Sequence, residues 1–324
     1  MRSASIRHAH SLLVLVLVLA ACAPSASQST ASPPALTPGP TSSPFVTPGA
    51  VTVVDDEDNT VVIPAAPQRI VSLTPAATEI LFAIGAGARV AAKVRDPAPY
   101  PPEADRLPIV ATFEGVDVEQ IVDLEADLVI AGGLGFTPPD AVTQMRGLGV
   151  PVVLVYADSI ETALDDIELI GDAAWAGDAA RELTASMRAD LDALSALTAD
   201  LPKPRVFYEI DATTTIFTPA DDSVYAEMLT LAGSNPITTD ASYVISLEKL
   251  VAADPEVILL GDGAYGVTGE QVAARPGWGS MTAVTTGAIR AVDDVVITRP
   301  GPRLVDGLRA LIAAIHPDVV LPLG

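Results

Sequence analysis

Residues 116–133 read VDVEQIVDLEADLVIAGG, and residues 244–263 read VISLEKLVAADPEVILLGDG. When the two stretches are aligned without gaps so that Glu119 lies opposite Glu248, their apolar and glycine positions also coincide. Each copy predicts a short helix that opens with an acid, then a tight turn, then a buried strand that ends at glycine. Helix followed by buried strand is the half-unit of a parallel sheet covered by helices. The sequence therefore predicts an α/β fold with two similar parallel-sheet lobes.

The stretch between the two copies is predicted to be helical. Residues 158–202 are dominated by Ala, Leu, Arg, Glu and Met, which favour helix, and the pattern breaks only near Gly171 and Gly177. Asp158 or Ser159 is a candidate N-cap, and Glu161 three residues after Asp158 fits a capping box. We therefore predict that one long helix bridges the two lobes.

The chain begins with the features of a secretory leader. Arg2 and Arg7 precede an apolar run at residues 12–19, which is short for a bilayer span, and the sequence Leu-Ala-Ala-Cys then ends at Cys22. These four residues resemble the bacterial lipobox, in which the cysteine is acylated and becomes the new N-terminus. We predict a signal peptide over residues 1–22, lipidation of Cys22 and a protein held outside the cytoplasmic membrane.

Residues 23–50 are rich in Pro, Ser, Thr and Ala and lack the apolar residues of a core, so we predict a disordered tether. The rest of the 324-residue chain is long enough for two domains with cores of their own. The predicted boundaries are an N-terminal lobe over 51–157, the interlobe helix over 158–202 and a C-terminal lobe over 203–324.

Composition narrows the class of function. The formal net charge is −23, which disfavours binding to nucleic acid. Cys22 is the only cysteine, and His316 is the only histidine beyond the predicted leader, so neither a thiolate metal site nor a His-rich one is expected. No Gly-x-Ser-x-Gly elbow or phosphate-binding loop occurs. We predict a monomer that is not an enzyme and carries no cofactor.

Residues 51–63 read VTVVDDEDNTVVI, in which two β-branched runs flank an acidic stretch. This pattern predicts a hairpin that leads into the first lobe. A calcium loop of the EF-hand type needs a longer run and a distal glutamate. We therefore expect the acidic stretch to be a turn exposed to solvent.

Three aromatic residues lie in predicted loops. Tyr100 stands among prolines, Phe113 follows a strand shortly before a glycine, and Tyr243 precedes the second copy of the repeat. Near the C-terminus, residues 295–297 are predicted to be a strand and residues 304–315 the last helix.

Several motifs occur in a fixed order along the folded part of the chain. They are RIVSLTP at residues 69–75, TEIL at 78–81, YPPE at 100–103, the two glutamate-containing copies, and RPGPR at 299–303. In this order they resemble the iron-siderophore and cobalamin class of periplasmic binding proteins, over residues 51–322. The resemblance implies a rigid two-lobed protein that binds its ligand between the lobes and delivers it to an ABC importer.

The resemblance also implies how the importer is contacted. Glu119 and Glu248 match the acidic residues, one on each lobe, that pair with arginines of the permease dimer. Charge-assisted pairs at two related positions would orient the docking. The alternative is that both glutamates only stabilise helix N-termini that begin at Asp117 and Ser246.

For the ligand, the resemblance implies a cleft that contains Tyr100, Phe113, Tyr243 and Arg299. Aromatic rings offer flat apolar walls, and arginine binds amide or carboxylate groups, although Arg299 could instead pair with a carboxylate of the protein. We expect cobalamin or another corrinoid first and a ferric siderophore second. The alternatives are a haem receptor with Tyr100 as axial ligand, and a ligand-sensing module without transport.

Overall fold

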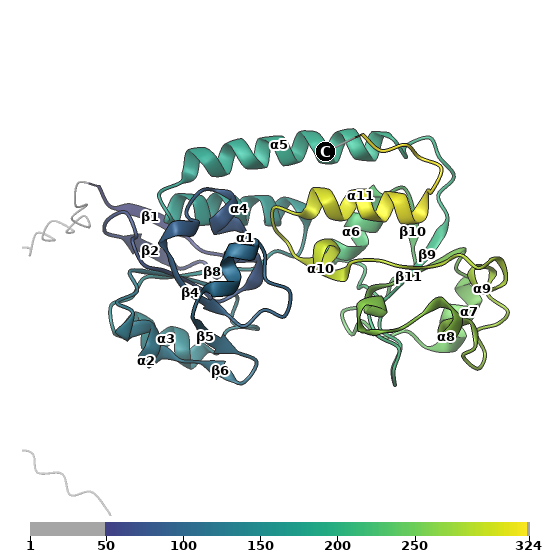
Figure 1. The fold of residues 1–324 in the computed structure, drawn as a ribbon, viewed down its shortest axis with the longest axis horizontal. Coiled ribbons are helices and arrows are strands. Elements are labelled where there is room, and N and C mark those ends of the chain that lie inside the picture. The colour runs from purple at the N-terminus through teal and green to yellow at the C-terminus, as the bar shows by residue number, and fades with distance from the viewer. Residues whose placement is uncertain (1–48, 323–324) are drawn as a thin grey trace, which may run out of the picture. The chain divides into compact units, whose positions relative to one another are not determined.

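The computed structural model describes residues 49–322 (Figure 1). The predicted signal peptide over 1–22, the lipidation site Cys22 and all but the last two residues of the predicted tether over 23–50 lie outside the described residues. Within 49–322, no helix combines the length and the apolar character needed to cross a membrane.

The N-terminal lobe is built on a six-stranded sheet in the order β6-β5-β4-β3-β7-β8. Every neighbouring pair is parallel except β5 and β6. Its strands are β3 (Ile70–Ser72), β4 (Val90–Val94), β5 (Ile109–Thr112), β6 (Gly115–Val116), β7 (Leu128–Gly132) and β8 (Val152–Val155). Its helices are α1 (Pro75–Ala83), η1 (Gly87–Arg89), η2 (Pro102–Arg106), α2 (Val118–Asp123) and α3 (Pro139–Gly147). Strands β7 and β8 are buried along their whole length, as expected for parallel strands covered on both faces.

The C-terminal lobe repeats this plan with a four-stranded parallel sheet in the order β10-β9-β11-β12. Its strands are β9 (Arg205–Glu209), β10 (Asn235–Pro236), β11 (Val257–Leu260) and β12 (Ile289–Ala291). Its helices are α6 (Val224–Leu231), α7 (Leu247–Ala253), η3 (Gly261–Tyr265), α8 (Gly269–Ala273), α9 (Thr282–Thr286), α10 (Asp294–Thr298) and α11 (Leu304–Ile315). The predicted α/β class with two parallel-sheet lobes is confirmed.

The repeat that predicted the two lobes forms α2 with β7 and α7 with β11. Each of these helices is capped by the residue before it, since the side chains of Asp117 and Ser246 accept from backbone N–H groups one turn further on. The turn that follows each helix contains a left-handed residue, Glu125 in one lobe and Asp254 in the other.

A matched arginine holds this turn in each lobe. Arg69, just before β3, donates from Nε to the carbonyl oxygen of Glu125 at 2.9 Å. Arg205, at the start of β9, donates from Nε to the carbonyl oxygen of Asp254 at 2.8 Å. The start of β3 is therefore hydrogen-bonded to the turn before β7, and the start of β9 to the turn before β11.

The predicted interlobe helix consists of two helices, α4 (Ile160–Ala173) and α5 (Gly177–Ala196). The predicted break near Gly171 and Gly177 is present, but it reverses the chain, with Trp175 at φ 57° in the turn. The helices run antiparallel and in close contact, because a Cβ at Gly171 would lie 2.3 Å from the Cβ of Ala180. The long helix is therefore α5 alone, which lies beside α11 (Figure 1).

Two local details differ from the prediction. Helix α4 is capped by Ser159, one of the two predicted caps, but its capping box pairs Ser159 with Thr162 rather than Asp158 with Glu161. Residues 295–297, predicted as a strand from their β-branched side chains, lie in helix α10. The side chain of the preceding Asp293 accepts from the backbone N–H of Val295 and caps that helix, and the cap outweighs the weak local preference.

The two lobes share one apolar core. Along β7, Leu128 and Ile130 face a core that also contains residues of α1, α4, α5, α6, α11 and β9, whereas Val129 and Ala131 face a core confined to the first lobe. Strand β11 alternates in the same way between the shared core and a core of the second lobe. One face of each sheet therefore packs only within its own lobe. The other face packs on the helices that connect the two lobes.

The leading hairpin consists of β1 (Val51–Val54) and β2 (Thr60–Ile63), and residues 56–58 of its acidic turn are exposed as expected, whereas Asp55 is not. Asp55 is buried, and it accepts from the guanidinium of Arg146 at 3.0 Å and from the backbone N–H of Leu154 at 3.2 Å. The turn folds onto the end of β8, where its carboxylates find cationic and N–H partners.

Asp166, on α4, is buried close to this turn. Burial first, and then the hydrogen bond and negative charge of Asp56, raise the pKa of the Asp166 carboxyl to about 9. The charges of Asp165 and Asp158 act in the same direction. Asp166 therefore keeps its proton at neutral pH and can donate it to the carboxylate of Asp56.

This raised pKa predicts a stability that falls as the solution becomes more alkaline. Between the unfolded pKa near 4 and the folded pKa of about 9, the folded state holds a proton that the unfolded state has released, so the free energy of unfolding decreases as pH rises through this window. Asp166→Asn should remove much of this decrease in melts recorded at pH 5 and pH 9. An equal decrease in Asp166→Asn and in the exposed control Asp190→Asn would contradict the assignment.

Candidate functional site

Exposed aromatic side chains gather where the parallel strands end. The chain has only six tyrosines, six phenylalanines and two tryptophans, yet five of these rings are exposed in loops that directly follow strands. They are Tyr100 after β4, Phe113 after β5, Phe136 after β7, Tyr156 after β8 and Tyr265 at the end of η3, after β11. Open α/β sheets bind ligands at this edge, and exposed rings cost free energy unless they have a partner.

The aromatic residues predicted from the sequence lie at this edge. Tyr100 is exposed and Phe113 is fully exposed at the tip of the turn between β5 and β6. Tyr243 is partly exposed, with a left-handed backbone at φ 57°. Their contact with a ligand stays a prediction.

Two further residues were missed by sequence reasoning. Phe136 and Tyr156 are 74% and 51% exposed, and their rings stack with centroids 5.7 Å apart. Tyr156 comes directly after the wholly apolar strand β8, and an aromatic residue at such a strand end is the signal that would have found it. Phe136 lies four residues beyond β7 and carries no comparable local signal.

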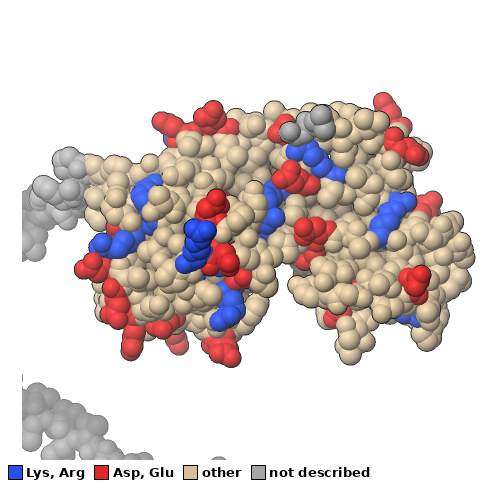
Figure 2. All heavy atoms as spheres, in the orientation of Figure 1, with Lys and Arg blue, Asp and Glu red and all other residues tan. Residues whose placement is uncertain are grey.

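The two lobes influence each other electrostatically at this edge. The pKa of the Tyr243 hydroxyl is raised, by burial first and then by the charges of Tyr156 and Asp222. Tyr156 belongs to the N-terminal lobe and Tyr243 to the C-terminal lobe, so this electrostatic effect crosses the lobe boundary. Figure 2 shows the surface hollowed between the lobes.

Arg299 joins the lobes beside this edge. Its guanidinium donates to Glu79 of α1 at 2.9 Å and to Asp96, in the loop after β4, at 2.6 Å. The arginine side chain is 13% exposed and that of Glu79 only 2%. Of the two roles that the sequence left open for Arg299, pairing with a carboxylate is the one seen here, and contact with a ligand stays a prediction.

Arg303 completes the cluster and also supports Tyr100. It contacts both carboxylate oxygens of Glu79, at 2.8 and 2.6 Å, and its guanidinium carbon lies 4.4 Å from the centroid of the Tyr100 ring. One buried carboxylate of the N-terminal lobe is thus held by two arginines that precede α11. The same contacts place a cation over one face of the tyrosine that was predicted to line the cleft.

Removal of the shared carboxylate should therefore be costly. Glu79→Ala leaves the largely buried guanidinium of Arg303 without its carboxylate partner and Arg299 with Asp96 alone, and we expect it to lower the free energy of unfolding by about 3–5 kcal/mol in urea denaturation. Glu125→Ala, which breaks the exposed pair with Arg69, should lower it by less than about 1 kcal/mol. Similar losses for the two variants would refute a structural role for the buried cluster.

The C-terminal lobe adds a buried acidic group at the ends of β9 and β11. Glu209 is fully buried and receives two hydrogen bonds from Arg275, at 2.6 and 2.8 Å. Asp262 lies beside it, and within residues 49–322 one of its carboxyl oxygens has no hydrogen-bond partner. Burial, and then the charge of Glu209, raise the pKa of Asp262 to about 7. The guanidinium of Arg275 therefore pairs with Glu209 and leaves Asp262 without an ion pair in the part of the chain described.

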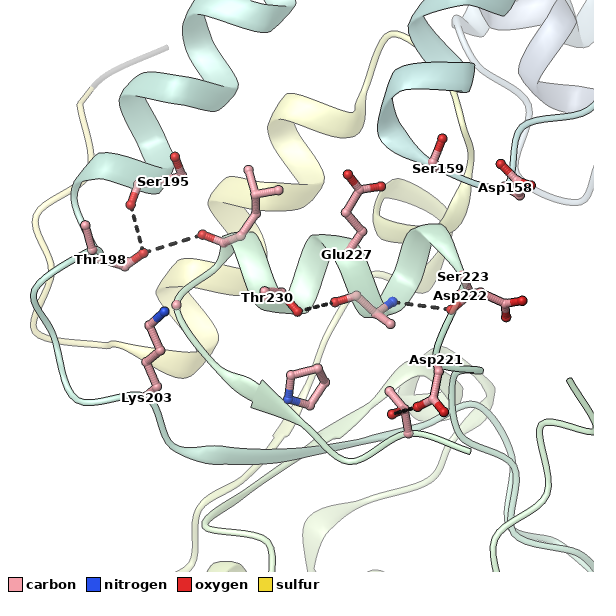
Figure 3. A pocket seen from close by; sticks show the side chains of 16 residues that line it. Asp158, Ser159, Ser195, Thr198, Lys203, Asp221, Asp222, Ser223, Glu227 and Thr230 are labelled. Carbon is pink, nitrogen blue, oxygen red and sulfur yellow. Dashed lines mark hydrogen bonds between the residues drawn. The ribbon is translucent and has the colours of Figure 1, made fainter. Parts of the chain in front are cut away.

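A polar cavity lies elsewhere. It has a volume of about 630 Å³ and is lined by the start of α4, the end of α5 and one face of α6 (Figure 3). No aromatic residue lines it, and its side chains are mostly hydroxyl and carboxylate groups. Glu227 in this cavity accepts from the backbone N–H of Ile160 at 2.7 Å and so caps α4. Its lining lacks the aromatic side chains that typically form the walls of a site for a flat apolar ligand.

Glu119 and Glu248 occupy equivalent positions in the first turns of α2 and α7. Both are exposed, and within residues 49–322 neither side chain forms an ion pair. Figure 2 shows acidic side chains gathered along the edge of the N-terminal lobe where α2 lies. Both side chains are therefore available to a partner, and their role in docking stays a prediction.

A fold of two parallel-sheet lobes with an aromatic edge between them defines a class of solute-binding proteins. The sequence profile of the family described as periplasmic binding protein matches residues 70–296 of this chain. The chain belongs to this family, and the resemblance noted from its motifs is confirmed. The family consists of extracytoplasmic solute-binding proteins of ABC transporters rather than enzymes.

Individual relatives agree with this assignment. An uncharacterized ABC transporter substrate-binding lipoprotein, YvrC of Bacillus subtilis, is 32% identical over 275 residues, which cover 83% of this chain and 86% of the relative. The vitamin B12-binding protein of Salmonella typhimurium is 31% identical over 222 residues, 67% of this chain and 79% of the relative. The periplasmic heme-binding protein RhuT from Roseiflexus superposes with a TM-score of 0.67 at 26% identity, over 77% of this chain and 98% of the other.

Proposed function

We propose that this protein captures cobalamin or a similar corrinoid at the aromatic edge between its lobes and delivers it to the permease of an ABC importer. The observation that carries the proposal is the set of five exposed aromatic side chains at strand ends in a chain that is poor in aromatic residues. A large, flat and partly apolar ligand is the chemistry that such rings accommodate.

The polar groups at this edge favour a ligand that donates hydrogen bonds. Glu209 pairs with Arg275, and the neighbouring Asp262 has a carboxyl oxygen without a hydrogen-bond partner among residues 49–322, so this wall offers a hydrogen-bond acceptor. The peripheral amide groups of a corrinoid donate N–H groups, whereas the carboxylates of many ferric siderophores and of haem would be repelled. The similarity to vitamin B12-binding proteins supports the same order of preference. A ferric siderophore is the second ligand class.

Haem is the alternative that a specific residue supports. Tyr100 presents an exposed phenol at the edge, and a tyrosine oxygen can serve as an axial ligand of haem iron. The similarity to a heme-binding protein of known structure is in keeping with this role. Arg303, which lies over the Tyr100 ring, would hold that ring in place beside the bound haem.

We further propose that the protein is anchored outside the cell membrane through an acylated Cys22 and docks on a permease dimer through Glu119 and Glu248. These glutamates lie in α2 and α7, and the turns that end these helices are held in the same way by Arg69 and Arg205. The two carboxylates are therefore carried by similar local structures. Two carboxylates in similar local structures suit the two equivalent subunits of a permease dimer. A sensing module without transport remains the other reading of the same lobes.

The ligand proposal predicts a saturable calorimetric titration of the full chain in detergent. Cyanocobalamin should bind one to one with a submicromolar dissociation constant, and Tyr100→Ala should weaken binding about tenfold through loss of one aromatic wall. Trp175→Ala, which removes an exposed ring from the turn between α4 and α5, is the matched control and should bind normally. Binding of haem with a visible absorbance shift that Tyr100→Ala abolishes would replace the corrinoid with haem.

The docking proposal predicts that binding and transport can be separated. The double variant Glu119→Ala, Glu248→Ala should keep the calorimetric affinity for the ligand and lose most uptake of labelled cobalamin in source cells that carry no other copy of the protein. Glu182→Ala, an exposed glutamate on α5, should leave uptake intact. Normal uptake by the double variant would reject these docking residues, and an absence of uptake in the wild type would favour the sensor.

A further inference from the structure

The acidic turn of the leading hairpin contacts the two loops that carry the stacked aromatic pair. We infer that Glu57 and Asp56 are positioning residues that hold Phe136 and Tyr156 in place as one wall of the ligand site. The link to a ligand rests on the proposed function. The positioning of the two aromatic side chains rests on the contacts of the turn.

Glu57 holds the loop after β7. Its carboxylate accepts a hydrogen bond from the backbone N–H of Leu134 at 3.1 Å. The same loop turns back on Gly133, whose carbonyl oxygen accepts from the backbone N–H groups of Phe136 at 2.7 Å and Thr137 at 3.1 Å. Fixing Leu134 therefore fixes the turn that presents the Phe136 ring.

Asp56 holds the loop after β8. Its carboxylate accepts from the backbone N–H of Tyr156 at 2.5 Å, and its own backbone N–H donates to the carbonyl oxygen of Leu154 at 3.1 Å. The hairpin turn thus binds the end of β8 on both sides of Val155.

The two loops and the turn meet at Gly133. A Cβ at this position would lie 3.2 Å from the Cβ of Tyr156 and 3.4 Å from a carboxylate oxygen of Glu57. The first distance is tighter than an ordinary contact, so a side chain would press the loops apart. The absence of a side chain allows the acidic turn to reach behind both loops at once.

Apolar packing cannot hold these rings, because most of Phe136 and half of Tyr156 are exposed to solvent. Ring stacking alone contributes about 0.5–1.5 kcal/mol, which leaves the loops free to rearrange. Hydrogen bonds from a carboxylate to a backbone N–H are stronger than neutral ones, and two of them act here from behind the rings. The geometry therefore assigns the orientation of the aromatic wall to the turn.

The turn has its own control residue. Asp58 lies next to Glu57, carries the same charge and has a left-handed backbone at φ 59°, but its exposed carboxylate makes no hydrogen bond within the described residues. Asp58→Asn therefore removes one charge from the same turn, keeps a residue that tolerates this backbone, and breaks no contact to the aromatic loops.

The test compares Glu57→Ala, Glu57→Gln and Asp58→Asn in the full chain in detergent. Hydrogen–deuterium exchange at residues 134–137 should become about tenfold faster in Glu57→Ala, which has no acceptor for the Leu134 N–H. Glu57→Gln, whose amide oxygen still accepts, should restore exchange close to the wild-type rate, and Asp58→Asn should not change it. Equal exchange in Glu57→Ala and the wild type would overturn the inference.

The ligand arm uses cyanocobalamin and haem as probes. For whichever probe the wild type binds, Glu57→Ala should weaken affinity about tenfold and Glu57→Gln less than twofold, whereas a purely structural loss would lower the melting temperature without this rescue. Faster exchange with unchanged affinity would overturn the role at the ligand site. If the wild type binds neither probe, the proposed function fails, and the exchange arm alone decides whether the turn positions the pair.

Discussion

The fold depends on an apolar core that the two lobes share. Each sheet turns one face to its own helices and the other face to a layer in which α4, α5, α6 and α11 pack together. A relative rotation of the lobes would therefore expose close-packed apolar surface, which costs free energy in proportion to its area. The buried carboxylate of Glu79, held by two arginines from beyond the lobe boundary, adds a polar tie at the edge nearest the aromatic rings. Together these contacts favour a rigid frame with small closure over wide hinge motion.

In a rigid protein of this kind, the candidate ligand-binding side chains lie on loops. The strand ends position Tyr100, Phe113, Phe136, Tyr156 and Tyr265, but the rings themselves are exposed and must be oriented by something other than a core. The protein uses polar contacts made from behind. An arginine lies over Tyr100, and carboxylates of the hairpin turn hold the loops of the stacked pair. Rings that are already ordered lose little conformational entropy when a ligand arrives, so more of the contact energy appears as affinity.

Local patterns in the sequence were enough to predict the two lobes, the repeated helix and strand, and the last helix. Each of these rests on periodicity and capping residues that lie within one stretch, such as Asp117 and Ser246. The errors lie where a distant contact decides the outcome. The acidic turn was expected to be solvated, but Asp55 is buried because Arg146 and Leu154, some ninety residues away, provide its partners. Likewise, the break in the interlobe helix was visible in the sequence, whereas the reversal depends on α4 and α5 packing together.

The candidate site was only partly predictable for the same reason. Tyr100 could be found because the prolines around it mark an exposed loop, whereas Phe136 becomes notable only through its stacking on Tyr156. The net charge of the chain also says little about the site, since the decisive charges are few and local. At the ends of β9 and β11 Glu209 pairs with Arg275, and among residues 49–322 a carboxyl oxygen of the neighbouring Asp262 has no hydrogen-bond partner. In the proposed function, this buried acceptor would favour a ligand that donates a hydrogen bond, and the aromatic rings would favour a ligand with a flat apolar face.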